Sequence, residues 1–135
     1  RILFYNDSAA TNPQTTAAAV NSFKEPVILI AGGRDAKFDY RVIGRALKKS
    51  SVRAVVLFGE NQKQVAGEIK FAKCPIKFSK TLGAALKYAF KRAQILARRE
   101  QRVNILFSPG AKSFDMFKNY ADRGQRFKKA VRALH

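Results

Sequence analysis

Short runs of β-branched and aromatic residues alternate along this chain with longer segments in which apolar residues recur every three or four positions. An alternation of this kind is typical of βα units, which stack into a parallel sheet covered by helices. The sequence therefore predicts an α/β fold. The expected strands are residues 2–5, 27–31, 52–58, 76–78 and 103–107, and the expected helices are residues 15–23, 40–48, 62–71, 82–99 and 113–134.

The central strands are nearly continuous apolar runs. The run 27–31 (VILIA) is apolar throughout, so both of its faces are expected to be covered by helices. In residues 82–99 the apolar side chains form one stripe, which is expected to face the sheet. We predict a Rossmann-like, three-layer domain with a mostly parallel sheet. The last helix is expected to begin at a Ser113 cap and to be interrupted near Gly124.

The length of 135 residues is typical of one domain with a core of its own. We expect residues 1–135 to form a single domain that folds without a disulfide or a metal. The chain starts at Arg1 rather than at Met, and its first apolar run is too short for a signal peptide. We therefore expect it to be part of, or derived from, a longer protein.

The chain is poor in the side chains from which catalytic and metal sites are built. Its only cysteine is Cys74, and its only histidine is the last residue, His135. These two exclude a structural zinc site and make a Ser-His-Asp or Cys-His group implausible, so we assign no catalytic residue and no metal ligand. Cys74 is expected to be a small buried residue in a reducing, intracellular compartment. No apolar run approaches the roughly 20 residues that span a bilayer, and we expect no membrane partner.

Three loops follow the carboxyl ends of predicted strands, where α/β folds bind ligands. They are residues 6–13 (NDSAATNP), 32–35 (GGRD) and 108–115 (SPGAKSFD). Their hydroxyl groups, amides and glycines are suited to binding an anion, although each loop can also be explained as a helix cap or a turn. The paired glycines match neither of the common nucleotide-binding motifs.

In this order the three loops resemble the C-terminal domain of the Mur ligases, and most closely that of the members that add D-glutamate. The resemblance spans almost the whole chain and rests on residues 6–13, 30–40 and 108–124, of which the last segment is highly specific. It implies a Rossmann-like domain that closes over a central ATP-binding domain and supplies the pocket for D-glutamate. In these ligases a carboxylate is activated as an acyl phosphate, which the amino acid then attacks.

The resemblance also implies a set of site residues. Thr11, Ser113, the backbone of Phe114 and Tyr120 would contact the carboxylates of D-glutamate. Asp7 would lie near the nucleotide. The central domain that binds ATP and Mg²⁺ is not part of this sequence, so we expect no cofactor in this chain and no ligase activity from it alone.

Two positions depart from the family pattern. Ala9 and Ala36 stand where the first and second motifs of the family carry lysine, although Lys37 lies beside the second position. A hydrogen bond from an ammonium group to a carboxylate contributes roughly 1.5 to 3 kcal/mol, so two such losses are expected to weaken substrate binding severely. Whether Lys37 replaces the second lysine is left open.

The positive charge is concentrated in the second half of the chain. The net charge is +18, of which residues 1–60 contribute +4 and residues 61–135 contribute +14. Such an excess is typical of proteins that bind a polyanion, usually nucleic acid. The candidate nucleic-acid contacts are Lys87, Lys91, Arg98, Arg99, Arg102, Lys128, Lys129 and Arg132. Phe71, Phe78, Tyr88 and Tyr120 lie among the bases, and we expect most of these rings to be in the core.

Two hypotheses follow. The leading one is a degenerate, non-catalytic Mur-ligase-like domain that serves as a basic structural or RNA-binding module in a ribonucleoprotein, such as a ribosome in an organellar matrix. The alternative is the D-glutamate-binding domain of a working ATP-dependent amino-acid ligase in the bacterial cytoplasm. Its partner would then be the central ATP-binding domain of the same ligase.

Overall fold

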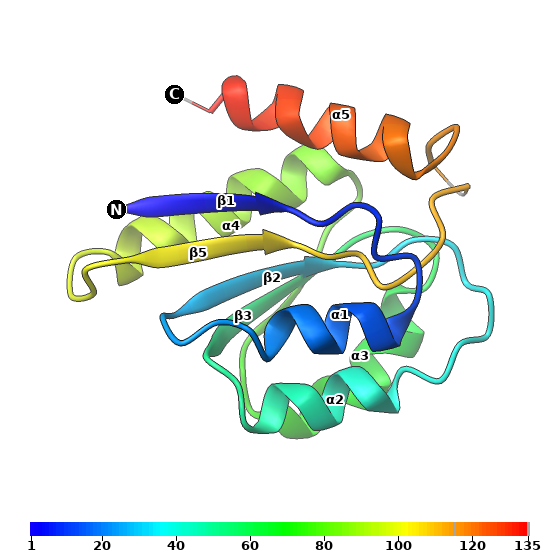
Figure 1. Ribbon diagram of the computed structural model, residues 1–135, viewed down its shortest axis with the longest axis horizontal. Coiled ribbons are helices and arrows are strands. Elements are labelled where there is room, and N and C mark those ends of the chain that lie inside the picture. Colours follow the sequence, from blue (N-terminus) through cyan, green and yellow to red (C-terminus); the bar gives the residue numbers. More distant parts are fainter. Residues whose placement is uncertain (115, 135) are drawn as a thin grey trace.

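The computed structural model describes residues 1–114 and 116–134, so Asp115 and His135 lie outside the described residues. Within that part of the chain, one wholly parallel sheet has the strand order β1-β5-β2-β3-β4 (Figure 1). The strands are β1 (Ile2–Asn6), β2 (Val27–Ala31), β3 (Val52–Leu57), β4 (Ile76–Phe78) and β5 (Val103–Phe107). The predicted α/β, Rossmann-like fold is confirmed.

Helices cover both faces of the sheet, which gives the molecule three layers. The helices are α1 (Pro13–Val20), α2 (Arg41–Lys48), α3 (Gln62–Ile69), α4 (Leu82–Leu96) and α5 (Tyr120–Arg132), and a short 3-10 helix, η1 (Lys70–Ala72), follows α3. Helices α1, α2 and α3 lie on one face, and α4 and α5 lie on the other (Figure 1). Two separate hydrophobic clusters fill the spaces between these layers.

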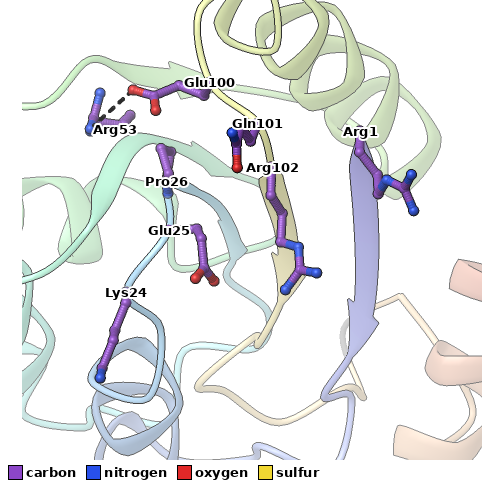
Figure 2. A pocket seen from close by; sticks show the side chains of 8 residues that line it. All are labelled: Arg1, Lys24, Glu25, Pro26, Arg53, Glu100, Gln101 and Arg102. Atoms are coloured by element: carbon purple, nitrogen blue, oxygen red, sulfur yellow. Dashed lines mark ion pairs between the residues drawn. The ribbon is translucent and has the colours of Figure 1, made fainter.

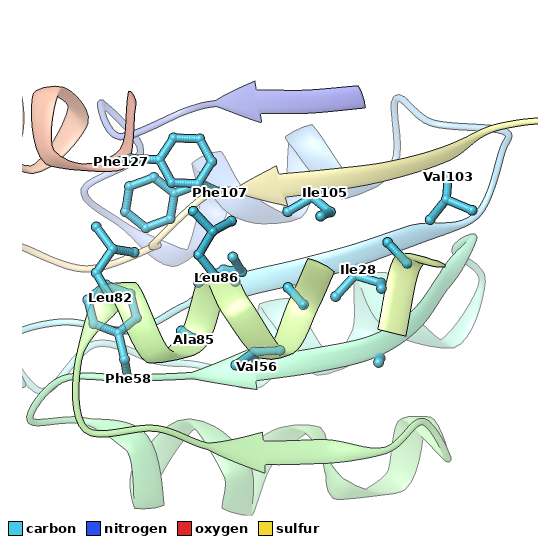
Figure 3. Packing of buried hydrophobic residues seen from close by; sticks show 14 residues of the cluster. Ile28, Val56, Phe58, Leu82, Ala85, Leu86, Val103, Ile105, Phe107 and Phe127 are labelled. Atoms are coloured by element: carbon cyan, nitrogen blue, oxygen red, sulfur yellow. The ribbon is translucent and has the colours of Figure 1, made fainter. Parts of the chain in front are cut away.

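Strands β2 and β5 are buried along their whole length, as the apolar run of β2 and the nearly apolar run of β5 predict. Because successive side chains of a strand point to opposite faces, each strand contributes to both clusters. Ile28 and Ile105 pack beneath α4, whereas Leu29 belongs to the cluster beneath α2. Near the carboxyl end of β5, the ring of Phe107 stacks on Phe127 of α5 with centroids 4.6 Å apart (Figure 3).

Side-chain caps set the starts of three helices. Asn12, Thr81 and Asn119 each accept a hydrogen bond from the backbone N–H three residues later, at 2.8 to 3.0 Å. In α1 the cap is followed by Pro13, which is favoured at the first helical position. The cap and the proline explain why α1 begins at residue 13 rather than at residue 15 as predicted.

The prediction for the last helix is wrong in two respects. Helix α5 begins at Tyr120, not at Ser113, because Asn119 is the capping residue. The carbonyl of Ser113 instead accepts hydrogen bonds in a turn, from the N–H groups of Met116 and Phe117. Gly124 does not interrupt the helix but lies inside it, at a point where the loop after β1 packs closely.

Two other helices are shorter than predicted. Helix α4 ends at Leu96 because the N–H groups of Arg98 and Arg99 bond to carbonyls only three residues back, which tightens the last turn. Helix α3 ends at Ile69 and continues as η1 until Lys73, whose φ of 59° is left-handed and stops the helix.

One side chain is placed in the core without hydrogen bonds. Asn104 of β5 is fully buried, and neither its amide nitrogen nor its amide oxygen has a partner among the described residues. Asn61, which is also fully buried, is satisfied: its oxygen accepts from the Gly33 N–H at 2.9 Å, and its nitrogen donates to the Tyr40 hydroxyl at 3.0 Å. The two asparagines therefore make opposite contributions to stability.

This contrast predicts opposite effects from the same substitution. Asn104→Leu removes two unsatisfied polar atoms at similar volume and should raise the free energy of unfolding by about 1 to 3 kcal/mol. Asn61→Leu leaves the Gly33 N–H unpaired and should lower it by a similar amount. Denaturant unfolding of both variants measures the two shifts, and a loss of stability in Asn104→Leu would contradict the assignment.

Candidate functional site

The loops after β1, β5 and β2 meet at the carboxyl edge of the sheet. In the strand register, Phe107 at the end of β5 lies between Asn6 of β1 and Ile30 of β2. Backbone hydrogen bonds then join the loops: Gly110 N–H donates to the Ala10 carbonyl at 2.9 Å, and Gly32 N–H donates to the Pro109 carbonyl at 2.9 Å. The three segments identified from the sequence therefore form one continuous surface.

The second loop approaches its neighbours closely because it contains two glycines. Gly32 has a φ of 122°, and a Cβ at this position would collide with the carbonyl oxygen of Phe58. A Cβ on Gly33 would come within 2.5 Å of the Lys112 carbonyl oxygen. The close approach permits a backbone hydrogen bond at 2.8 Å from Arg34 N–H to the Lys112 carbonyl, which holds the loops after β2 and β5 together.

A fully buried arginine lies behind these loops. The guanidinium of Arg123, in the first turn of α5, donates to the Ser8 hydroxyl at 3.1 Å, to the Ser8 carbonyl at 2.6 Å and to the Ala111 carbonyl at 2.8 Å. One side chain thus connects α5 to the loops after β1 and β5. Because a guanidinium presents its N–H groups in a fixed plane, these contacts also orient the two loops.

The start of α5 is held to the loop after β1 by further contacts. The Ser8 hydroxyl donates to the Tyr120 carbonyl at 2.7 Å, and the Asn6 side-chain amide donates to the Gly124 carbonyl at 3.1 Å. A Cβ on Gly124 would lie 3.2 Å from the Ser8 Cβ, so the glycine keeps this packing close. These contacts bring the Tyr120 backbone to the segment that contains Thr11.

Asp7 occupies a defined position at the same edge. One oxygen of its carboxylate accepts a hydrogen bond from the Ser108 hydroxyl at 2.8 Å. The Ser108 carbonyl in turn accepts from the Thr16 hydroxyl, within α1, at 3.0 Å. Asp7 itself is partly exposed, so its carboxylate is oriented by the protein and accessible at the surface.

The loop after β2 is supported from below by Asn61 and Tyr40. Asn61 binds Gly33, and the Tyr40 hydroxyl lies 3.0 Å from the Asn61 amide and 3.4 Å from the Asp35 carboxylate. Burial raises the pKa of the Tyr40 phenol, so the hydroxyl stays protonated and donates a hydrogen bond to the Asp35 carboxylate. The loop thereby has a fixed conformation up to Asp35.

The structure brings the loops of the predicted glutamate contacts together, but the side chains differ in exposure. Ser113 is almost fully buried and Thr11 is partly buried, whereas more than half of Phe114 and of Tyr120 is exposed. Ala9, Ala36 and Lys37 are exposed in the same group of loops. Asp115 of the third motif lies outside the described residues. The contacts of these residues with glutamate stay predictions.

Sequence reasoning missed the residues that support the site, above all Arg123. Arg123 lies within the third motif, residues 108–124, but sequence reasoning assigned it no role of its own, although it is buried and makes three hydrogen bonds to neighbouring loops. A signal was present, because Arg123 lies one helical turn before the apolar residue Phe127, and residues four apart share one face of a helix. An arginine in register with a buried ring on a helix is a candidate for a buried role.

The eight predicted nucleic-acid contacts lie away from this edge. All are exposed, on α4, on α5 or in the turn between α4 and β5. The expectation that most of the interleaved rings are in the core is wrong: Phe71, Phe78 and Tyr120 are each more than half exposed, and of the four only Tyr88 packs against the core.

Cys74 is half-buried, and burial raises the pKa of its thiol.

A hollow of about 820 Å³ lies at the opposite edge of the sheet, near the amino ends of β1 and β5 (Figure 2). Its lining mixes charges of both signs, and Arg53 forms an ion pair with Glu100 at 3.6 Å. Arg102 is the one predicted nucleic-acid contact that lines it. The lining residues are Arg1, Lys24, Glu25, Pro26, Arg53, Glu100, Gln101 and Arg102. This hollow is therefore separate from the surface formed by the three loops.

Within residues 1–114 and 116–134, no three His, Cys, Asp or Glu side chains are placed to hold a metal ion. A search of the same residues finds no helix with the length and hydropathy needed to cross a bilayer.

Arg123 offers a test of how the edge is assembled. Arg123→Met leaves two carbonyls and a hydroxyl without their donor and should lower the free energy of unfolding by about 3 to 5 kcal/mol. Arg126→Met, one turn from it, removes an exposed ion pair with Asp122 and a cation–π contact with the Phe117 ring, and it should cost less than about 2 kcal/mol. Thermal unfolding of both variants measures the difference, and equal losses would contradict the assembly role of Arg123.

Comparison with known proteins gives consistent matches. The family model described as the Mur ligase, glutamate ligase domain matches residues 1–106. The UDP-N-acetylmuramoylalanine--D-glutamate ligase of Acetivibrio thermocellus is 37% identical over 141 residues, which cover 98% of this chain and 29% of that protein. The enzymes of the same name from Bdellovibrio bacteriovorus and Salinibacter ruber are 36% and 38% identical, covering 99% and 98% of this chain and 27% of each relative. The chain thus spans less than a third of the length of these relatives.

These matches correct the leading hypothesis drawn from the charge. The prediction of a degenerate, RNA-binding module in a ribonucleoprotein is wrong, because the relatives that align along nearly the whole chain are D-glutamate ligases and nothing in the comparisons points to RNA or to a ribosome. The resemblance stated from the three loops is confirmed. The chain belongs to the Mur ligase, glutamate ligase domain family.

Proposed function

We propose that this chain is the D-glutamate-binding domain of a ligase that joins D-glutamate to UDP-N-acetylmuramoylalanine. The observation that carries the proposal is the joining of the three loops into one surface, held by buried Arg123. The relatives that bear this activity in their names are 35 to 38% identical along nearly the whole chain, which supports the same assignment.

Glutamate has two carboxylates, and each is best held by hydrogen-bond donors. The proposed donors are the hydroxyls of Thr11 and Ser113 and the backbone N–H of Phe114, with Tyr120 beside them. Their loops are fixed by contacts that do not involve these donor groups, so the donors are positioned before the substrate arrives. Holding both carboxylates leaves the amino group of glutamate directed outward as the nucleophile.

Formation of the amide bond also needs a second protein surface, which holds the group that the amine attacks. The amine of D-glutamate would attack the carbonyl carbon of an acyl phosphate, forming the amide bond as inorganic phosphate leaves and the amine loses a proton. We assign the acyl phosphate, ATP and Mg²⁺ to the central ATP-binding domain of the same ligase, which the relatives' greater length can accommodate. Asp7 faces this junction in the proposal, since its partly exposed carboxylate is oriented by Ser108.

Lys37 is our candidate for the missing cation of the second loop. Its backbone is left-handed, with a φ of 56°, and its N–H donates to the Asp35 carboxylate at 3.1 Å. Asp35 is itself held by Tyr40 and Gln64, so the backbone from which Lys37 projects is fixed while the side chain is exposed. A long ammonium side chain on a rigid loop can serve the role of the lysine that position 36 lacks.

The Ser113 assignment predicts a loss of catalytic efficiency with D-glutamate. In the full-length ligase, Ser113→Ala should lower kcat/KM for D-glutamate about 10- to 100-fold, because one hydrogen bond to a charged group is lost. The KM for ATP should stay unchanged. Ser22→Ala removes a hydroxyl that bonds only the Ala19 carbonyl at the end of α1, and it should have no effect. An unaltered KM for D-glutamate in Ser113→Ala would reject the assigned contact.

The Lys37 assignment makes a separate prediction. Lys37→Met should raise the KM for D-glutamate at least about tenfold by removing a charged hydrogen-bond donor, and Ala36→Lys in the same variant should restore part of the loss. Lys49→Met, which removes an exposed charge just after α2, is the matched control. If Lys37→Met and Lys49→Met behave alike in steady-state kinetics, the cation of this site comes from another residue.

A further inference from the structure

An unusual pattern lies in residues 70–80, where the sequence Lys-Phe-x-Lys occurs twice, at 70–73 (KFAK) and at 77–80 (KFSK). The segment contains four lysines and no acidic residue. Each phenylalanine is therefore flanked by two cations in the sequence. We call residues 70–80 the Lys-Phe edge.

The Lys-Phe edge lies at the margin of the sheet. It comprises η1 and β4, and β4 is the outermost strand, paired with β3 alone among the described residues. Phe71 is 67% exposed and Phe78 is 51% exposed, and all four lysines are exposed. Two large rings in water are costly for a folded domain, so this surface is suited to being covered.

The geometry argues against covering by another protein. Strand addition needs a long free edge, but β4 has only three residues, is preceded by Pro75 and carries exposed Lys77. The fully buried core of a protein interface is depleted in lysine, whereas here two lysines flank each ring in the sequence. A deformable anionic surface needs no free strand edge. It can also take up the two rings while the ammonium groups stay at its boundary with water.

We propose that the Lys-Phe edge binds the surface of an anionic phospholipid bilayer. Phe71 and Phe78 would enter the boundary between headgroups and acyl chains, and the four lysines would contact lipid phosphates. The ammonium of Lys70 lies over the Phe71 ring, 5.2 Å from its centroid. That ring face is already occupied by a cation of the same chain, which favours insertion into lipid over stacking on a nucleic-acid base.

The rest of the chain supports the same attraction at longer range. Residues 61–135 carry a net charge of +14, which draws the protein to an anionic surface before the rings insert. The proposal departs from the sequence-based expectation of no membrane partner, which rested on the lack of a membrane span. Binding at the bilayer surface needs no span, and no described helix could form one. The proposal does not depend on the glutamate-binding function, since none of its residues belongs to the loops after β1, β2 and β5.

Flotation of the protein with vesicles tests the proposal. Vesicles of equal parts phosphatidylglycerol and phosphatidylcholine should carry the protein upward, and vesicles of phosphatidylcholine alone should not. Phe71→Ser with Phe78→Ser should weaken binding about tenfold for each ring. Replacing Lys70, Lys73, Lys77 and Lys80 by Gln should weaken it about fivefold for each lysine. All six positions are exposed or half exposed, so the variants should keep the thermal stability of the parent.

Two matched controls isolate the edge from general charge and exposed apolar surface. Lys24, Lys48, Lys49 and Lys91 are four exposed lysines elsewhere, and replacing them by Gln removes the same charge. Ile95→Ser removes an apolar side chain that is exposed to a similar degree. Smaller losses in both controls would support the proposal. It would be overturned by equal losses in the two lysine variants, by phenylalanine variants that bind like the parent, or by single-stranded RNA that binds more tightly through the same two rings.

Discussion

The buried guanidinium of Arg123 is the interaction on which the carboxyl edge of the sheet depends. It bonds to groups from two loops that are separated by about a hundred positions in the sequence, and it does so from the first turn of a third element. Removing an arginine from water is costly unless its N–H groups find acceptors, and the Ser8 hydroxyl and the carbonyls of Ser8 and Ala111 are among those that it binds. Arg123 therefore fixes the positions of the two loops, and the oxygens of these loops replace the water that its guanidinium loses on burial.

The strand order explains why such a connection is required. Strand β5 is the last in the chain but lies between β1 and β2, so the loops that follow β1 and β5 are neighbours in space (Figure 1). Strand pairing ends with the strands themselves, at Asn6 and Phe107, and the backbone beyond them needs other partners. Ser108, Gly110 and Arg123 supply those contacts, which turn the end of the sheet into a defined surface.

The net charge and the order of the three loop motifs carry different information about this chain. A net charge of +18 indicates attraction to anions in general, and it led to a nucleic-acid hypothesis that the comparisons overturned. The eight bases chosen for that hypothesis are spread over α4, α5 and a turn, so no single element carries them. The three loop motifs combine a few residue types in a fixed order, and this order was specific enough to indicate the family.

The sequence by itself determined the fold class, the five strands to within a residue and the loops that form the candidate site. These features follow from the spacing of apolar residues along the chain, which can be read locally. It did not reveal the start of α5, where Asn119 rather than Ser113 caps the helix, since both residues can cap and tertiary contacts select one. Only the tertiary structure decided that Arg123 is buried and that Phe71 and Phe78 are exposed. Burial depends on what packs against a residue from distant parts of the chain, so a local pattern, such as the register of Arg123 with Phe127, can only suggest it.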